Sequence, residues 1–386
     1  MSCSTFPSRS ALLLLATLFI ASSSAALTNQ FQHFYPQHSR QYEFILQNNC
    51  SQQFQNYLTG RLADFPIDWL GGGGKTSVLV QPVITCLLDT VSEYIKAASS
   101  SAQVLLGVAP PILATLGAST DELAMVNVVG RRPLLAVLIS VGSPSVYLDR
   151  IFDFRAPSKM LQRKEGQHRP YRPSSTAKRI LMTVMQYVVA GLAAANIAIL
   201  NWQLGLGTVC SWWSNTVYGP LVWGVLSIPI HFGGTFALRL RVRRIYSNTE
   251  KEDRVGFGKW WRLMPQRLYR YTQSEFVPAA FQDQVIRLME FDERKVFVVW
   301  SWFLSTATVI HILFGSLLFS GLLFIGPQDA LLVIFRYILS VLACRSLVVY
   351  ELAGMRQQYR PEADDDSADG YELDPRIIRI GHAPQK

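Results

Sequence analysis

The chain is predicted to be an all-α, polytopic transmembrane protein with about five spans and a small luminal amino-terminal domain. Two apolar runs, residues 297–325 and 330–350, are separated only by a short polar turn and form the clearest membrane hairpin. The first run exceeds the roughly 20 residues that a helix needs to cross about 30 Å of hydrocarbon. The composition agrees, since 49% of residues are hydrophobic and only 16% are charged.

We interpret residues 1–26 as a cleaved secretory signal peptide. Arg9 precedes an apolar stretch at residues 11–20, and small residues follow that stretch. The stretch is too short to span a bilayer comfortably, and small residues at its end are what signal peptidase requires. The mature chain is therefore expected to begin outside the cytosol, in a membrane of the secretory pathway, with the plasma membrane as the expected destination.

Residues 27–101 are expected to form the luminal or extracellular domain. Asn49 begins an acceptor pattern for an N-linked glycan, and Cys50 and Cys86 are the two cysteines of this segment. A non-cytosolic compartment favours their pairing as a disulfide. The two expectations compete in part, because a bridge at Cys50 hinders modification of its neighbour. Apolar residues at helical spacing from Pro82 onward predict an amphipathic helix.

The glycine-rich stretch that ends in Gly74-Lys75-Thr76 imitates a phosphate-binding loop. We reject that interpretation because Trp69 stands where the loop requires a glycine, and because no buried strand is predicted before it. A flexible tether is the better interpretation.

Residues 102–148 contain two short apolar runs, 102–118 with a proline pair at 110 and 111, and 133–148. The following residues, 149–179, carry an excess of Lys and Arg, which is typical of a cytosolic loop. An odd number of crossings must therefore precede them. We expect residues 102–118 to cross, kinked at the proline pair, while residues 133–148 lie in the interface or re-enter. The converse assignment fits nearly as well.

The remaining topology follows from the same rules. Two spans are predicted within residues 180–238, and residues 239–296 form a basic, aromatic cytosolic loop. The hairpin occupies residues 297–350, and residues 351–386 are expected to form an acidic, disordered cytosolic tail. The amino terminus is then luminal and the carboxyl terminus cytosolic.

The expected partners are the lipid bilayer and, through the tail, a protein. Residues 257–271 interleave basic and aromatic side chains, a pattern typical of a segment that lies on anionic lipid. The net charge of +9 does not indicate nucleic-acid binding, because the Lys and Arg residues flank apolar runs and act as orientation signals.

Ionisable residues within the apolar runs are candidates for an intramembrane polar site, because burying them in lipid is costly. His231 and His311 lie inside runs, and Arg336 lies on the order of 10 Å inside the luminal end by helical rise. Arg336 needs Asp329, a carbonyl or water as its partner. Arg345 can snorkel to the cytosolic end. No Asp or Glu occurs within the runs from residue 180 onward, which weakens coupled transport.

No catalytic, cofactor-binding or metal-binding constellation is found, since the chain lacks a Gly-x-Ser-x-Gly elbow and paired His at metal-binding spacing. An enzyme is therefore not expected, and no cofactor is assigned. No repeated halves of a transporter are visible either. We interpret the protein as a non-enzymatic membrane scaffold or accessory protein. The alternative is a channel or carrier for a small solute or anion, in which flux would depend on Arg336.

The run GVAPPILATLG at residues 107–117, followed by RPLLA at 132–136 and SVGSP at 140–144, resembles uncharacterised multi-pass membrane proteins of filamentous fungi. The resemblance covers chiefly residues 82–148. It implies a fungal source and a shared membrane core, and it carries over no catalytic residue, because that family has no assigned activity.

Overall fold

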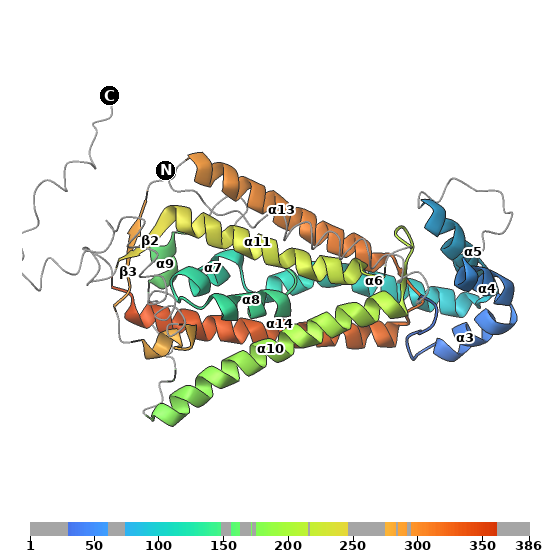
Figure 1. Cartoon of the computed structure of the whole chain (residues 1–386), viewed down its shortest axis with the longest axis horizontal. Coiled ribbons are helices and arrows are strands. Elements are labelled where there is room, and N and C mark those ends of the chain that lie inside the picture. The colour runs from blue at the N-terminus through green and yellow to red at the C-terminus, as the bar shows by residue number, and fades with distance from the viewer. Residues whose placement is uncertain are drawn as a thin grey trace, which may run out of the picture.

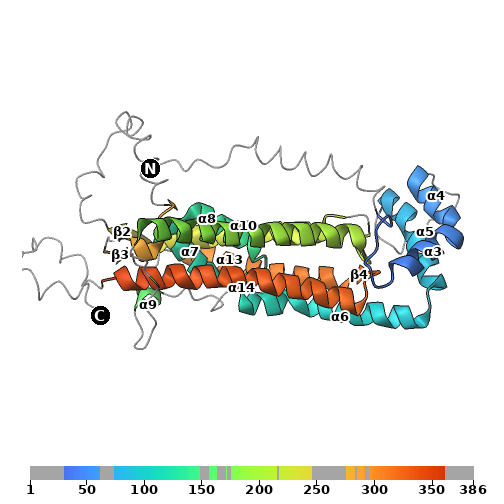
Figure 2. The ribbon, with the colours of Figure 1, turned by 90° about the horizontal axis from the view of Figure 1, so that it is seen from below.

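The computed structural model describes residues 30–60, 74–147, 156–162, 171, 175–214, 217–245, 275–282, 285–291 and 295–360. Within them, five helices are long and apolar enough to cross a membrane: α6 (Glu93–Leu116), α10 (Thr176–Gly207), α11 (Gly219–Arg241), α13 (Lys295–Ser320) and α14 (Pro327–Gln358). They pack side by side along one axis (Figures 1 and 2). The predicted all-α, polytopic membrane fold is confirmed.

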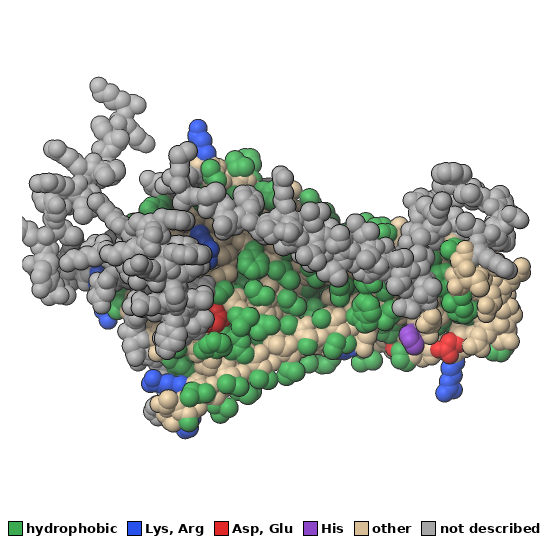
Figure 3. Space-filling model, viewed as in Figure 1, with side chains coloured by type: hydrophobic (Ala, Val, Ile, Leu, Met, Phe, Trp, Pro, Cys, Tyr) green, Lys and Arg blue, Asp and Glu red, His purple; other side chains and the backbone are tan. Residues whose placement is uncertain are grey.

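The outer surface of this bundle is apolar, as a bilayer requires. Large side chains such as Leu192, Val299 and Phe303 are exposed. Figure 3 shows hydrophobic side chains along the length of the bundle, with charged ones mainly toward its ends. A water-soluble protein rarely exposes so large an apolar area, so this surface is suited to contact with lipid.

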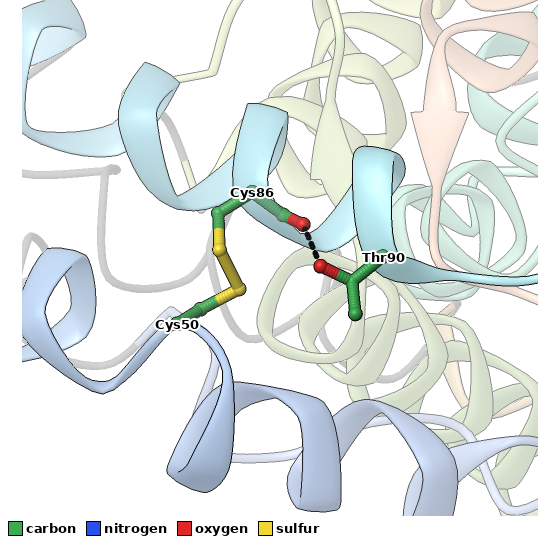
Figure 4. Close-up of a disulfide and its surroundings, with 3 residues drawn as sticks. All are labelled: Cys50, Cys86 and Thr90. Atoms are coloured by element: carbon green, nitrogen blue, oxygen red, sulfur yellow. Dashed lines mark hydrogen bonds between the residues drawn. A yellow bond between two sulfur atoms is a disulfide. The ribbon is translucent and has the colours of Figure 1, made fainter.

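A small helical domain caps one end of the bundle, which we call the disulfide end (Figure 1). It comprises α3 (Ser39–Asn48), α4 (Ser51–Thr59) and α5 (Gly74–Thr90). The two cysteines expected to pair, Cys50 and Cys86, are joined there by a disulfide (Figure 4). Asn49, the predicted glycan acceptor, is exposed beside the bridge. The bridge stabilises a domain whose own core is small.

Aromatic packing fastens this domain to the bundle. Phe324, in the turn between α13 and α14, lies among the rings of Phe31, Phe34 and Tyr42, with centroids 5.3 to 6.3 Å away. Nearby, β1 (Val209–Cys210) pairs antiparallel with β4 (Leu322–Leu323). These contacts join the connection from α10 to α11 with the connection from α13 to α14.

Two predicted boundaries near the disulfide end are corrected. The amphipathic helix expected from Pro82 onward divides into α5 and α6, because the chain turns at Val91 and Ser92. The first long helix consequently begins at Glu93, inside the segment assigned to the luminal domain at residues 27–101. Ser92 precedes it in extended conformation, and Lys96 pairs with Glu93 at 2.8 Å in its first turn.

The first span is broken. Helix α6 continues through Pro110 and Pro111, where a kink is predicted, and it ends at Leu116. After Gly117 the chain starts α7 (Thr120–Val128), whose first turn is capped reciprocally by Ser119 and Glu122. Figure 1 places α6 in the disulfide half of the bundle and α7 in the other half. The interruption therefore lies at residues 117–119.

Residues 133–147 fold back beside that break. Helix α8 (Pro133–Gly142) packs against α10 and α11. The chain then turns, and Tyr147 returns to the start of α7, where the Thr120 amide donates to its carbonyl oxygen at 3.2 Å. Unwound backbone at this depth is tolerated only when protein groups satisfy it. Here Ser145 Oγ donates to the carbonyl oxygen of Pro110 at 2.7 Å.

The opposite end, which we call the carboxyl end, is more ordered than the sequence predicts. Strands β2 (Val242–Ile245) and β3 (Arg287–Glu290) pair antiparallel, and η2 (Ala279–Phe281) packs on α14. The short α9 (Pro157–Leu161) lies at the same end. The segment 239–296 is thus not a simple loop, although residues 257–271 lie outside the described residues.

The predicted disordered tail at residues 351–386 is corrected over its first residues, 351–360. Helix α14 continues to Gln358, because Glu351 is fully buried by partners inside the bundle and Tyr359 bridges to Ile286. The predicted signal peptide at residues 1–26 and the acidic residues after Arg360 lie outside the described residues.

Candidate functional site

A row of polar side chains runs along the buried face of α11. Trp223, Ser227, His231 and Thr235 recur every four residues on an otherwise apolar helix, and all four are buried. Residues four apart on a helix share one face, so these side chains form a continuous stripe. The stripe faces the break in the first span.

The facing groups come from α7, from α8, from the 143–147 turn and from α13. The Asn127 amide Nδ2 donates to Thr235 Oγ1 at 3.3 Å, and Ser227 Oγ lies 3.1 Å from the carbonyl oxygen of Ser140. His311 Nε2 lies 2.9 Å from the carbonyl oxygen of Pro144.

The His311 ring also stacks on the indole of Trp223, with centroids 5.5 Å apart. We call the stripe and its facing side chains the polar seam: Asn127, Ser143, Trp223, Ser227, His231, Thr235 and His311.

Several atoms of the polar seam have no hydrogen-bond partner within the described part of the chain, although they are buried: Asn127 Oδ1, Ser143 Oγ, Trp223 Nε1, His231 Nδ1 and His311 Nδ1. Leaving a buried donor or acceptor unpaired costs about 1–3 kcal/mol, and native proteins pair most such groups. Their concentration along one line indicates a place that accommodates a hydrogen-bonding guest.

A recess opens on this seam between α7, α8 and α11. Its enclosed volume is about 10 Å³, which is room for about one water molecule. Eight side chains line it: Leu123, Asn127, Ala136, Val137, Ser140, His231, Phe232 and Thr235. His231 is the only ionisable side chain in this lining, so no formal charge is present when its ring is neutral. The recess therefore suits an uncharged polar group.

His311 and Arg336, two of the predicted intramembrane residues, have different surroundings. His311 belongs to the polar seam. Arg336 lies on α14 and donates from Nε and Nη2 to Asn196 Oδ1 at 3.0 and 2.7 Å, and from Nη1 to Gln203 Oε1 at 2.9 Å. Asp329, one of its expected partners, instead accepts from the amide of Gln37 at 3.0 Å.

A second buried polar region, the Arg132 cluster, lies toward the carboxyl end and comprises Arg132, Gln186, Tyr187, Glu275 and Glu351. Arg132 and Glu351 are fully buried and paired, with Nη1 and Oε1 2.6 Å apart. Gln186 joins both, at 2.6 Å from Arg132 Nη1 and 2.7 Å from Glu351 Oε1. Glu351 Oε2 accepts from the amide of Ala279 at 3.0 Å.

Glu275 completes the Arg132 cluster from the segment before η2. Its Oε1 accepts from Tyr187 at 2.6 Å and from the Leu135 amide at 3.1 Å, while its carbonyl oxygen accepts from Arg132 Nε at 2.9 Å. A segment distant in sequence is thereby fixed between α8, α10 and α14.

The sequence analysis missed these carboxylates, because they lie outside the apolar runs. Arg345, expected to snorkel, instead pairs with Glu122 of α7. A signal was present in the sequence, because Glu351 directly follows the apolar run 330–350 and Arg132 directly precedes the run 133–148.

Among the described residues, no group of three or more His, Cys, Asp or Glu is arranged to hold a metal ion. Comparison with protein families, curated proteins and solved structures found no match to this chain. The fold and its apolar surface define the class of the protein, a polytopic α-helical membrane protein in contact with the lipid bilayer.

Proposed function

We propose that the protein is a non-enzymatic channel or carrier that passes a small, uncharged, hydrogen-bonding solute through the bundle. The observation that carries the proposal is the polar seam, where buried polar atoms without partners line the break of the first span. Broken helices and unwound backbone at membrane depth are the usual construction of solute sites in transporters.

A membrane scaffold, which the sequence favours, is the second interpretation. Its support comes from the basic-aromatic segment at 257–271 and the acidic residues after Arg360, both outside the described residues. A scaffold does not require unpaired polar atoms in its core, so the polar seam favours transport.

The charge of the region also favours an uncharged solute over the anion considered from the sequence. Arg336, the cation that an anion would need, is occupied by two amide oxygens, those of Asn196 and Gln203. The formal charges of Arg132 and Glu351 neutralise each other. The seam contributes dipoles and hydroxyls only.

Flux in proteoliposomes tests the proposal. Stopped-flow light scattering of vesicles that contain the full chain should show faster entry of glycerol or urea than protein-free vesicles, without conductance of chloride or potassium. Thr235→Val should lower that flux about three- to tenfold, equivalent to about 0.6–1.4 kcal/mol from one intramembrane hydrogen bond.

Thr306→Val is the matched control. Thr235 Oγ1 donates to the carbonyl oxygen of His231 at 3.2 Å, and Thr306 Oγ1 donates in the same way to that of Trp302 at 3.0 Å. Thr306, however, lies on the exposed face of α13. Its flux should equal that of the native chain, as should that of Arg336→Ala. Chloride flux that Arg336→Ala abolishes would favour the anion carrier, and absence of all flux would favour the scaffold.

We further propose that the disulfide end faces the lumen or cell exterior and the carboxyl end faces the cytosol. The proposal is supported by the disulfide, by exposed Asn49 as a glycan acceptor, and by the odd number of long apolar helices among the described residues. The plasma membrane is the proposed destination.

Reporter cysteines test this orientation. Gln55→Cys places a reporter at an exposed position of the disulfide end, and Lys159→Cys places one at an exposed position of the carboxyl end. Cys3, Cys210 and Cys344 are replaced in this experiment, whereas Cys50 and Cys86 are kept because they are bridged. Burial also raises the pKa of the Cys210 thiol, which slows its reaction with maleimide. On sealed cells an impermeant maleimide should label position 55 and spare position 159, and the opposite pattern would invert the topology.

A further inference from the structure

We propose that residues 275–282 anchor the carboxyl end of the bundle in the membrane by inserting the side chains of Phe276 and Val277, the tip of the segment, into the lipid leaflet on that side. The partner of this surface is lipid, at the boundary between acyl chains and headgroups. The sequence predicts this segment as part of a loop in the cytosol, and nothing in the proposed transport requires its insertion. Three features support the insertion: the side chains that face outward, their depth along α10 and their surroundings.

The segment, with the sequence EFVPAAFQ, has two exposed side chains, and both are apolar. Phe276 is 54% exposed and Val277 is 38% exposed. Glu275 and residues 278–281 are buried, and Gln282 is partly buried. Turns in water mostly present glycine, asparagine, aspartate or serine. An aromatic ring beside a branched aliphatic side chain is instead suited to contact with lipid.

Hydrogen bonds on both sides of the tip hold it on the outer face of the bundle. Before the tip, Glu275 Oε1 accepts from the Tyr187 hydroxyl at 2.6 Å. After the tip, the Ala279 amide donates to Glu351 Oε2 at 3.0 Å. Both partners belong to the Arg132 cluster. The tip therefore cannot rotate inward without breaking bonds to buried groups, which is costly.

Contacts with α10 give the depth of the tip. The rings of Phe276 and Tyr187 have centroids 5.5 Å apart, and the guanidinium carbon of Arg179 lies 5.9 Å from the centroid of the Phe281 ring. Tyr187 follows Arg179 by eight positions, which is about 12 Å along a helix. The segment therefore runs along α10 from the basic end turn of that helix inward, and the tip lies at the deeper end.

The level of Tyr187 coincides with the edge of the hydrocarbon. Its neighbour Gln186 donates to Glu351 Oε1 at 2.7 Å, and Glu351 directly follows the apolar run 330–350. By helical rise that run covers about 30 Å, the thickness of the hydrocarbon. The tip consequently lies where acyl chains meet headgroups, the level at which aromatic side chains are enriched in membrane proteins.

The tip also continues an apolar surface that faces lipid. On α10, Val184 and Val188 flank Tyr187 and are 50% and 45% exposed. Because Phe276 packs on the Tyr187 ring, the tip lies beside these side chains. The lipid-facing surface of α10 thus extends onto the 275–282 segment, and the same lipid covers both.

Spin-label accessibility tests the insertion. Phe276→Cys and Val277→Cys are made in the full chain, in the cysteine background of the orientation experiment, and each is labelled with a nitroxide in nanodiscs. Collisions with oxygen, which concentrates among acyl chains, are compared with collisions with a nickel chelate, which stays in water. Oxygen should prevail at both positions, and collisions with the chelate should be several-fold rarer than at Lys159→Cys.

Two variants calibrate the measurement. Val184→Cys lies on the lipid-facing surface of α10 and should favour oxygen, whereas Lys159→Cys lies at an exposed position of the carboxyl end and should favour the chelate. Chelate collisions at the tip as frequent as at position 159 would place the tip in water and overturn the insertion. Rare collisions with both reagents would show that protein covers the tip, which would also overturn it. If Phe276→Cys does not fold, Val277→Cys decides.

Discussion

The polar seam and the Arg132 cluster lie in the same bundle, but they differ in charge and in how many of their buried atoms lack a hydrogen-bond partner. The central charges of the Arg132 cluster are paired at 2.6 Å and bridged by Gln186. Its two atoms without a partner in the described chain, Arg132 Nη2 and Glu275 Oε2, belong to side chains whose other polar atoms are bonded. The polar seam consists of neutral groups, and several of its buried atoms have no partner in the described chain. Leaving a charge unpaired costs much more than leaving a neutral dipole unpaired. The comparison favours a structural role for the Arg132 cluster and agrees with the transport role proposed for the polar seam.

The largest expected effect comes from breaking the Arg132 cluster. Arg132→Met should lower the free energy of unfolding by about 3–5 kcal/mol, because it leaves Glu351 buried without its cation. Chemical denaturation in detergent, followed by tryptophan fluorescence, measures this change. The double variant Arg132→Met/Glu351→Leu should recover part of the loss. If Arg132→Met lowers the free energy of unfolding by less than about 1 kcal/mol, the Arg132 cluster contributes no more to stability than an exposed ion pair, and the contrast with the polar seam is lost.

The next effect tests how the 279–281 turn is held against α14. A methyl group at Gly354 would lie 2.4 Å from the backbone nitrogen of Ala280. Gly354→Ala should therefore destabilise the protein by about 1–3 kcal/mol through overpacking. Gly191→Ala is the matched control, since nothing lies within 4 Å of the added atom, and it should be neutral or stabilising by up to about 1 kcal/mol. Equal melting temperatures for the two variants would contradict the close approach.

A smaller effect is expected at His311, a ring of the polar seam that lies within hydrogen-bond distance of a backbone carbonyl. His311→Phe removes the bond to the Pro144 carbonyl oxygen and should destabilise the bundle by about 0.5–2 kcal/mol. The same denaturation measurement applies. His311→Gln, which retains a donor, should lose less. If the two variants lose equally, packing on Trp223 rather than the hydrogen bond explains the effect.

The smallest effect is expected at an atom without a partner. Trp223→Phe removes the buried Nε1 and should change the unfolding free energy by less than about 1 kcal/mol, because lost packing is offset by removal of an unpaired donor. A loss as large as that of Arg132→Met would show that the polar seam is a structural element, and the comparison would fail. Proteoliposome flux of this variant should still change.

Local patterns predict much of this fold, and long-range pairing explains what they miss. The spans were readable because hydropathy is a property of consecutive residues, and the cysteine pair was readable because only two cysteines share that segment. The role of Glu351 was not readable, since its partner Arg132 is 219 positions away. In the polar seam, the four-residue spacing from Trp223 to Thr235 is visible in the sequence, but nothing local shows that it faces a broken helix.

The length of two helices bears on how far the bundle reaches beyond the bilayer. Helices α10 and α14 each contain 32 residues, which corresponds to about 48 Å by helical rise, against about 30 Å of hydrocarbon in an average bilayer. The apolar run of α14 covers only residues 330–350, and Lys178, Arg179 and Arg356 lie in the end turns of the two helices. These end turns therefore extend past the hydrocarbon, so that the bundle presents helical surface to water and lipid headgroups at the carboxyl end.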